Sequence, residues 1–168
     1  MNSLAEVFRV LDRMRAEGVI AQYAIGGATA VLFYAEPSRT YDLDVFVILP
    51  PGAEDVLVSL SSIYRWAGER GFALDAEHLL IHGVPVQLLP AYNALVADAV
   101  REARAHAYDD VQVRVVDPEH LVALALQAGG ARRRERAWQL LQSGAVDRER
   151  LRTILVKHGI DAEIPDDV

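Results

Sequence analysis

The amino-acid sequence predicts an α/β (α+β) protein in which helices flank a small mixed sheet and a helical part follows at the C-terminus. Short apolar runs typical of strands alternate with helical segments up to residue 116, and the pattern then becomes wholly helical. Hydrophobic residues make up 52% of the 168 residues, which supplies enough apolar material for a substantial core. We therefore expect an α/β core over residues 1–116 and a helical subdomain over residues 117–168 packed on it.

The first half of the chain is expected to alternate helices and strands. Glycine pairs and proline-rich stretches interrupt the apolar patterns, as they do at element ends. In chain order, the patterns predict a helix over residues 3–17, a strand over 19–25, a short helix over 28–35, a strand over 43–49 and a helix over 53–69.

The second half begins with two apolar runs joined at Gly83, which predict a hairpin-like strand pair. In chain order, we expect these strands over residues 72–82 and 84–90, a helix over 93–105, a strand over 110–116, and then three helical segments. The breaks between those last segments are predicted at Gly129-Gly130 and at Gly144.

Composition excludes several classes of protein. There are no cysteines, so disulfide scaffolds and thiolate metal sites are excluded. No apolar run approaches the ~18 residues that a membrane-spanning helix needs, and the N-terminal residues lack a signal-peptide pattern. The net charge of −7 argues against a broadly electropositive binder of nucleic acids. We therefore expect a cytoplasmic protein with no membrane partner.

Two aspartates, Asp42 and Asp44, stand at the head of an otherwise apolar strand. Residues two apart in a strand project from the same face, so the two carboxylates should lie about 7 Å apart at the backbone. At that distance they repel by about 0.6 kcal/mol in water and by about 2.4 kcal/mol at an effective dielectric near 20. A cation between them reverses the sign, and oxygen ligands suit Mg²⁺ or Mn²⁺. Alternatively, the acids mark only the exposed entrance of the strand.

The stretch IGGATA lies between the preceding strand and the next helix, and it offers a second feature. Gly26 and Gly27 let a backbone turn approach a phosphate closely, and the helix that contains Thr29 begins directly after them. An ordinary tight turn is the alternative for the glycine pair alone. A phosphate cradle beside a carboxylate pair is the arrangement that phosphoryl or nucleotidyl transfer requires.

These motifs resemble the nucleotidyltransferase superfamily, which includes polymerase-beta-like, kanamycin-type and minimal bacterial nucleotidyltransferases. Ile25-Gly26-Gly27 matches the first part of its signature, and Asp42-Leu43-Asp44 matches the acid-hydrophobic-acid strand. The upstream SRTYDLD pattern, with Arg39 and Thr40, and the helical tail are closest to the abortive-infection toxin-type nucleotidyltransferases. The resemblance covers residues 19–90 by motif and the rest only loosely.

The resemblance implies Mg²⁺-dependent transfer of a nucleoside monophosphate from a nucleoside triphosphate (NTP) to an acceptor hydroxyl, with release of pyrophosphate. Asp42 and Asp44 would hold Mg²⁺ or Mn²⁺. The residues expected to contact the triphosphate are Gly26, Gly27, Thr29, Arg39, Thr40, Arg132 and Arg133. A tRNA, a protein or a small molecule would be the acceptor, and a toxin-type protein would have an antitoxin partner.

The sequence departs from the family pattern at the third acid. That acid should stand in the middle of VPVQLLP, where this chain has Gln87. A glutamine cannot act as a general base, and base catalysis is worth roughly 10²–10⁴ in rate. Asp75 and Glu77 on the partner strand are candidates to replace it, unless they are solvated hairpin acids. A catalytically degenerate protein that binds a nucleotide or a partner is therefore the alternative, and an unrelated α/β domain is a third hypothesis.

Basic residues in the stretch ARRRERAW lie where the family's C-terminal helices carry phosphate-binding cations. Arg132, Arg133, Arg134 and Arg136 are therefore candidates for contact with the triphosphate or with an acceptor nucleic acid. The alternative is a solvated helix start. His78 and His82 are four residues apart in the predicted strand and are interpreted as surface histidines.

Overall fold

The computed structural model describes residues 3–35, 42–51 and 56–165. Its elements, in chain order, are α1 (Ser3–Ala16), β1 (Gln22–Ile25), α2 (Gly27–Val31), β2 (Leu43–Ile48), α3 (Val56–Glu69), β3 (Ala73–Asp75), β4 (His78–Ile81), β5 (Val84–Pro90), α4 (Ala94–Arg101), β6 (Arg104–Tyr108), β7 (Val111–Val115), α5 (Pro118–Ala128), α6 (Ala131–Gln142) and α7 (Arg148–Lys157). This mixed α/β architecture confirms the predicted fold class.

The described strands form one seven-stranded sheet in the order β3-β4-β5-β2-β1-β7-β6. Strand β2 lies in the middle, antiparallel to β1 and parallel to β5. The remaining pairs are antiparallel except β1 with β7. Residues near the start of β2 are therefore surrounded by strands on both sides, which places Asp42 and Asp44 at the centre of the sheet rather than at an edge.

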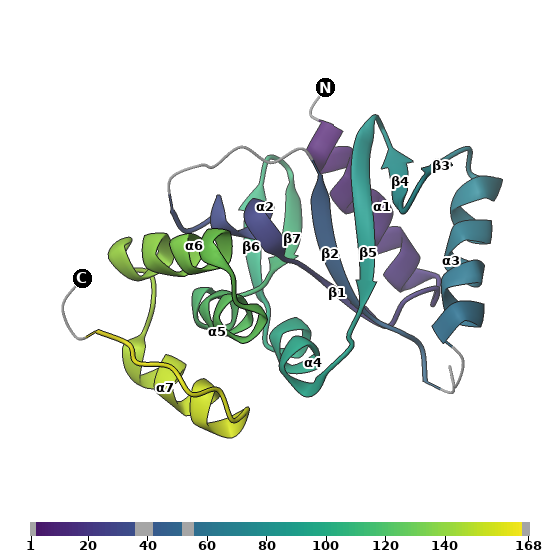
Figure 1. Ribbon diagram of the computed structural model, residues 1–168. Coiled ribbons are helices and arrows are strands. Elements are labelled where there is room, and N and C mark those ends of the chain that lie inside the picture. The colour runs from purple at the N-terminus through teal and green to yellow at the C-terminus, as the bar shows by residue number, and fades with distance from the viewer. Residues whose placement is uncertain (1–2, 36–41, 52–55, 166–168) are drawn as a thin grey trace.

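The two faces of the sheet are covered by different helices (Figure 1). Helix α1 packs against β1, β4, β5 and β7, while α2 and α4 pack against β2. Leu43, Val45 and Val47 are at most 1% exposed, as expected for the β2 residues that face the core. The intervening residue Asp44 projects from the opposite face of the strand. The alternation along β2 thus places Asp44 on the face opposite Leu43, Val45 and Val47, together with the buried Phe46.

The three C-terminal helices gather at one end of the molecule, away from α3 (Figure 1). Helix α5 packs against α2, α4, α6 and α7, and α6 also contacts α2. Asp117 caps α5 by accepting a hydrogen bond from the His120 amide at 2.8 Å, and Asp147 caps α7 in the same way. The breaks between these three helices lie at the predicted glycines. The division of the chain into a core and a helical subdomain stays a prediction.

Two sequence-based element predictions were wrong. The strand predicted over residues 72–82 is two strands, because Ala76 has a φ of +53° and turns the chain between β3 and β4. His82 also has a positive φ, of +50°, and lies in the turn after β4, so it does not share a strand with His78. The backbone therefore separates the two histidines that the spacing had grouped.

The helix predicted over residues 93–105 ends at Arg101, and β6 follows it. Strand β6 pairs antiparallel with β7 along its whole length, from Arg104 with Val115 to Tyr108 with Val111. Asp109, with a φ of +51°, makes the tight connection between these strands. At the end of the predicted helix, pairing with β7 thus outweighs the helical spacing of the apolar residues. Periodicity within the segment does not reveal this pairing.

No helix in the described part of the chain is both long and apolar enough to cross a membrane.

Candidate functional site

A row of polar side chains crosses the sheet at the level of Asp44. The register pairs Asp44 of β2 with Gln87 of β5, so the two side chains share a face. Continuing the antiparallel register of β4 and β5 by one residue places His78 beside Gln87. On the other side of β2, the Gly26 amide donates a hydrogen bond to the Asp44 carbonyl oxygen at 2.9 Å. The glycine turn, the acid and the glutamine therefore lie on three adjacent strands.

Both glycines of the turn are required by close contacts with β2. A Cβ atom built on Gly27 would overlap the carboxylate oxygen Oδ2 of Asp44, and Gly27 also has a φ of +58°. A Cβ atom on Gly26 would lie 2.6 Å from ring atom Cδ2 of Phe46. Only glycine fits both positions without moving these side chains. The backbone of the turn consequently lies directly against the acid of the site.

Thr29 follows the glycines in α2 and is buried, with 5% of its surface exposed. Its hydroxyl Oγ1 donates a hydrogen bond to the backbone carbonyl oxygen of Asp42 at 3.4 Å. This bond fixes the backbone just before β2. In this structure Thr29 therefore positions Asp42.

The electrostatic surroundings of the two aspartates differ. Burial raises the pKa of Asp44 above its ordinary value, and the negative charge of Asp42 raises it further, while Arg136 and His78 oppose the shift. Asp42 instead has a neighbour within hydrogen-bonding range, because Nε2 of His78 lies 3.3 Å from its Oδ2. His78 thus influences both carboxylates, whereas Arg136 acts on Asp44.

His78 is a site residue that sequence reasoning missed. The sequence interpretation treated it as a surface histidine paired by spacing with His82. Its place at the first position of β4, two strands away from Asp42, follows from the sheet order. The predicted hairpin did contain a signal for this placement. It pairs the strand that includes His78 with the strand that includes Gln87, and so brings the two residues close together. The turn at Ala76 was needed to identify where that strand begins.

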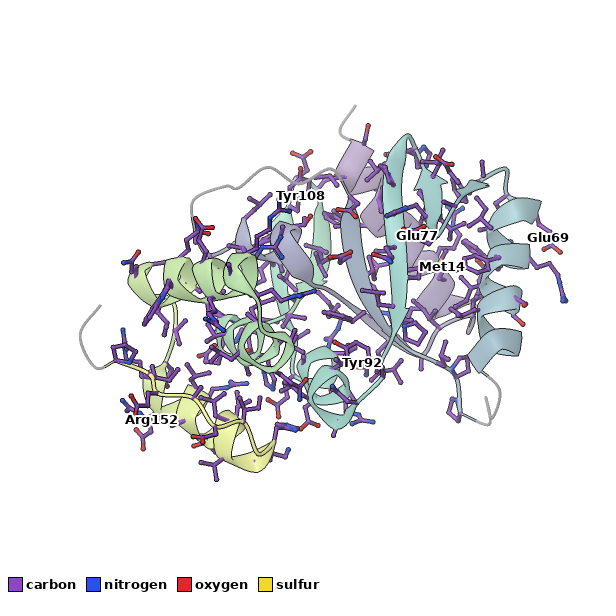
Figure 2. All side chains as sticks on the ribbon, in the orientation of Figure 1. Met14, Glu69, Glu77, Tyr92, Tyr108 and Arg152 are labelled. Atoms are coloured by element: carbon purple, nitrogen blue, oxygen red, sulfur yellow. The ribbon has the colours of Figure 1, made fainter. Side chains whose placement is uncertain are left out.

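A cavity of about 320 Å³ opens beside Asp44 and Gly27. Its walls come from α2, β2, α5 and α6, together with Leu89 and Tyr92 near the end of β5. Tyr92 precedes α4 and is 67% exposed, and Figure 2 shows it near the start of that helix. Most of the remaining lining is apolar. The cavity therefore combines one acid, two aromatic rings and two arginines with otherwise apolar walls.

The arginines of α6 divide between two sides of the helix. Arg133 and Arg136 line the cavity that contains Asp44, and Arg132 lines an adjoining hollow with them. Arg134 instead lies beside Trp138 on another side of α6. Residues three and four apart in a helix share a face, which explains why these three arginines converge. Of the four arginines that the sequence named as candidates, Arg133 and Arg136 therefore line the cavity and Arg132 stands at its border, whereas Arg134 lies away from it.

The candidates to replace the third acid are not equally placed. Asp75 is opposite His78 in the β3–β4 register and is exposed, one strand farther from Asp44 than His78 is. Glu77 lies in the turn before β4 and is exposed. Of these three side chains, His78 is therefore the one adjacent to Gln87 in the sheet register, on the side opposite Asp44. Arg39 and Thr40, also predicted at the site, lie outside the described residues.

The environment of Asp42 and Asp44 fits a divalent ion. Asp44 is a partly buried carboxylate whose pKa is raised by burial and by a second acid, so its ionised form is poorly compensated by the protein. A bound cation would supply the missing compensation. Carboxylate oxygens on one face of a strand are also the donor type that Mg²⁺ and Mn²⁺ prefer. The absence of a side chain at Gly27 is what lets the Asp44 carboxylate lie against the backbone of the turn.

A second cluster of ligating groups, formed by Glu102, Asp117 and His120, lies between α4, α5 and α7. Its donor atoms all lie within 4.8 Å of one another. The Arg150 guanidinium already occupies this cluster, since Nη2 lies 2.8 Å from Asp117 Oδ2 and 2.9 Å from Glu102 Oε2. Nδ1 of His120 is 2.9 Å from the other Asp117 oxygen. This cluster is a salt-bridge network that joins helices, and a metal ion would have to displace the arginine.

Comparisons with known proteins agree with this geometry. No family model matches the chain, and no curated protein does. Several solved structures have a similar fold, and three of them illustrate the likeness. An antigenic nucleotidyltransferase-like protein from Paracoccidioides brasiliensis has a TM-score of 0.55 and 16% identity, covering 93% of this chain and 87% of its own.

The other two are structures of ANT(2'')-Ia. A crystal structure in complex with adenylyl-2''-tobramycin has a TM-score of 0.53 and 13% identity, covering 93% of this chain and 97% of that one. A solution structure of the same antibiotic-resistance factor has a TM-score of 0.51 and 15% identity, covering 95% of this chain and 93% of that one. At such identities the similarity establishes the fold. This chain therefore has the nucleotidyltransferase fold, as its motifs predicted.

Proposed function

We propose that this protein transfers a nucleoside monophosphate from an NTP to an acceptor hydroxyl, with Asp42 and Asp44 as the metal-binding acids. The observation that carries the proposal is the contact of the Gly26-Gly27 turn with β2. It places a backbone that can approach phosphates directly beside a carboxylate with a raised pKa. The nucleotidyltransferase fold of the chain supports the same assignment.

The reaction joins the acceptor oxygen to the α-phosphorus of the NTP and breaks the bond from that phosphorus to the bridging oxygen of pyrophosphate. The acceptor proton leaves with solvent or a base. A divalent ion held by Asp42 and Asp44 would neutralise charge on the phosphates and on the leaving pyrophosphate. The residues of the chain then bind and orient the substrates.

Three groups around the cavity have substrate-binding roles in this proposal. Arg133 and Arg136 donate hydrogen bonds to phosphate oxygens, because guanidinium groups match phosphate geometry. Tyr92 stacks on the nucleotide base at the cavity mouth, an interaction worth roughly 1–3 kcal/mol. The Gly26-Gly27 backbone admits the phosphates next to Asp44. Two arginines in the cavity also disfavour a strongly cationic acceptor and favour a neutral or anionic one, such as a tRNA or a protein hydroxyl.

Gln87 favours a second candidate function, in which the protein binds a nucleotide or a partner without turnover. Its amide stands opposite Asp44, at the position of the third acid, and it can orient an acceptor hydroxyl but cannot take its proton. The two aspartates also lie near His78 and Arg136, which compensate part of their charge. A degenerate protein of this kind, like a toxin-type enzyme with an antitoxin, would be expected to have a protein partner.

The experiment that tests nucleotide binding is a thermal-shift panel with ATP, GTP, CTP and UTP, each with and without Mg²⁺ or Mn²⁺. Ligand at 100 times its dissociation constant stabilises the native state by about 2.7 kcal/mol, which is several degrees for a chain of this length. We expect a metal-dependent shift in the wild type that disappears in Asp42→Asn and Asp44→Asn. Absence of any metal-dependent shift in the wild type would contradict the proposal.

Pyrophosphate release separates the enzyme from the degenerate alternative. The enzyme predicts release when a pool of tRNA or cellular protein is added to the preferred NTP, and loss of release in Asp44→Asn. The alternative predicts binding without release, and a gain of release in Gln87→Asp, since this change restores a carboxylate opposite Asp44. Gln112→Asp, on the exposed face of β7, is a matched control for the added charge.

A further inference from the structure

The distance between the side chains of His78 and Asp42 is close to that between two ligands of one metal ion. Nε2 of the imidazole lies 3.3 Å from Oδ2 of the carboxylate. Two donor atoms that occupy adjacent positions on one octahedral ion, with bonds of about 2.1–2.2 Å, stand about 3 Å apart. The two side chains therefore have nearly the separation that a shared ion requires. Both are only partly exposed, with side-chain exposures of 22% for His78 and 44% for Asp42.

The residues around this pair place it next to the acid that the proposed reaction uses. Gln87 lies between His78 and Asp44 in the transverse row, so the residue that lacks a charge is flanked by an imidazole on one side and an acid on the other. The chain supplies two carboxylates at this place and one imidazole instead of a third carboxylate. Replacing an anionic oxygen by a neutral nitrogen lowers the attraction for a hard ion such as Mg²⁺ and favours metals that accept nitrogen.

We propose that His78 is a ligand of the divalent ion at Asp42 and Asp44, and that this ligand set gives the site a preference for Mn²⁺ over Mg²⁺. The inference rests on the proposed function, because it assigns a further residue to the same metal site. In this arrangement the imidazole binds through Nε2, the atom that faces Asp42. Asp44, whose carboxylate lies against the Gly27 backbone, would supply the second carboxylate ligand.

His82 provides a matched control for His78. It lies four residues along the chain, in the turn after β4, and its ring packs against Phe72 with centroids 5.6 Å apart. It has no contact with either aspartate among the interactions of the described residues. A change in metal binding caused by general loss of a histidine or of surface charge would therefore appear in both variants, whereas loss of a ligand would appear only at His78.

The test is a titration of the full-length protein with MnCl₂, followed by the electron paramagnetic resonance signal of free Mn²⁺, and then competition with MgCl₂. The variants are His78→Gln, His82→Gln and Asp42→Asn. We expect the wild type to prefer Mn²⁺ by at least about 10-fold and His78→Gln to lose about 10-fold in Mn²⁺ affinity with little change for Mg²⁺. His82→Gln should behave like the wild type, and Asp42→Asn should bind neither ion measurably.

The outcomes separate this inference from the proposed function. Equal Mn²⁺ affinity in the wild type and in His78→Gln, with loss in Asp42→Asn, would overturn the inference and leave the proposed metal site intact. No binding of either ion to the wild type would overturn both. If His78→Gln does not fold, the inference is tested instead on the wild type, by the NMR signals of the histidine ring nitrogens. Addition of ZnCl₂ should then shift Nε2 of His78 and not that of His82, and the absence of a selective shift would overturn the inference.

Discussion

Two groups of acidic side chains in this protein differ in how their charge is balanced. Asp117 is fully buried, yet it receives hydrogen bonds from His120 and an ion pair from Arg150 at 2.8 Å. Burial by itself would raise the pKa of Asp117, but these partners outweigh it and hold the pKa below its ordinary value. Asp44 is less buried, and its pKa is nevertheless raised, because burial and the negative charge of Asp42 outweigh the opposing effect of Arg136 and His78.

The comparison shows which acids serve the fold and which are available to a ligand. The Asp117 cluster brings three ligating groups within 4.8 Å of one another, but its positions are taken by Arg150. Asp44 of the other pair instead lines a cavity of about 320 Å³. Proximity of acids alone is therefore a poor guide to a metal site, and the balance of charge around them is a better one.

The largest expected effect on stability is that of Asp117→Asn. The amide still caps α5, but it loses the charge that pairs with Arg150 and His120, and breaking a buried pair costs about 3–5 kcal/mol. Asp44→Asn removes a poorly compensated charge and should not lower the free energy of unfolding. Urea denaturation of both variants measures the difference. Similar destabilisation in the two would contradict the contrast between the clusters.

The pH dependence of the free energy of unfolding should follow from the lowered pKa of Asp117. Because the pKa of Asp117 is lower in the folded state than in the unfolded chain, its contribution is present above the unfolded value of about 3.9. It is lost as the pH falls through the folded pKa. We therefore expect the wild type and Asp117→Asn to differ most at neutral pH and to converge in acid, measured by urea denaturation from pH 7 downwards. A difference that grows in acid would contradict this sign.

Gly27→Ala should abolish the metal-dependent nucleotide shift, because the added Cβ overlaps the Asp44 carboxylate. It should also destabilise the fold by about 1–2 kcal/mol, since Gly27 has a φ of +58°. Gly18→Ala is the matched control, with a φ of +77° and open space where its Cβ would lie. Both variants should show the backbone penalty in thermal melts, and only Gly27→Ala should lose nucleotide binding. Loss in both would indicate a general folding defect.

Arg136→Gln should weaken binding of the triphosphate by about tenfold, the effect expected for one charge-assisted hydrogen bond. Its side chain lines the cavity beside Asp44, whereas Arg134 lies near Trp138 on another side of α6. Arg134→Gln removes the same charge from the same helix and should leave the affinity unchanged. Isothermal titration with the preferred NTP provides the measurement. Equal losses in the two variants would mean that α6 acts through its overall charge.

The smallest effect is expected for Lys157→Gln. Lys157 donates a hydrogen bond to Asp98 at 2.8 Å, and this contact lowers the pKa of Asp98. The lysine side chain is exposed, so water and salt screen the pair, and His158 keeps its own contact with Asp98 at 3.0 Å. The midpoint of thermal unfolding should therefore hardly change. A loss comparable to that of Asp117→Asn would show that exposure does not decide the strength of these pairs.

Sequence reasoning anticipated much of the site because its signals are local. The Gly-Gly turn, the alternation of Asp42 and Asp44 with core residues, and the position of Gln87 all follow from short spacings. The register then placed Gln87 opposite Asp44. Of the predicted α6 arginines, Arg133 and Arg136 line the cavity and Arg132 borders it, whereas Arg134 does not reach it. The closeness to toxin-type proteins stays a prediction.

The sequence by itself determined the fold class and which residue types face the site, because helical and strand periodicities and glycine requirements act within a few residues. Only the tertiary structure decided that β6 joins the sheet, that His78 meets Asp42 and that Arg136 meets the cavity beside Asp44. The last two contacts join residues 36 and 92 positions apart, and they depend on strand order and on the packing of α6. No local pattern encodes such distances, since they result from which surfaces the whole chain buries together.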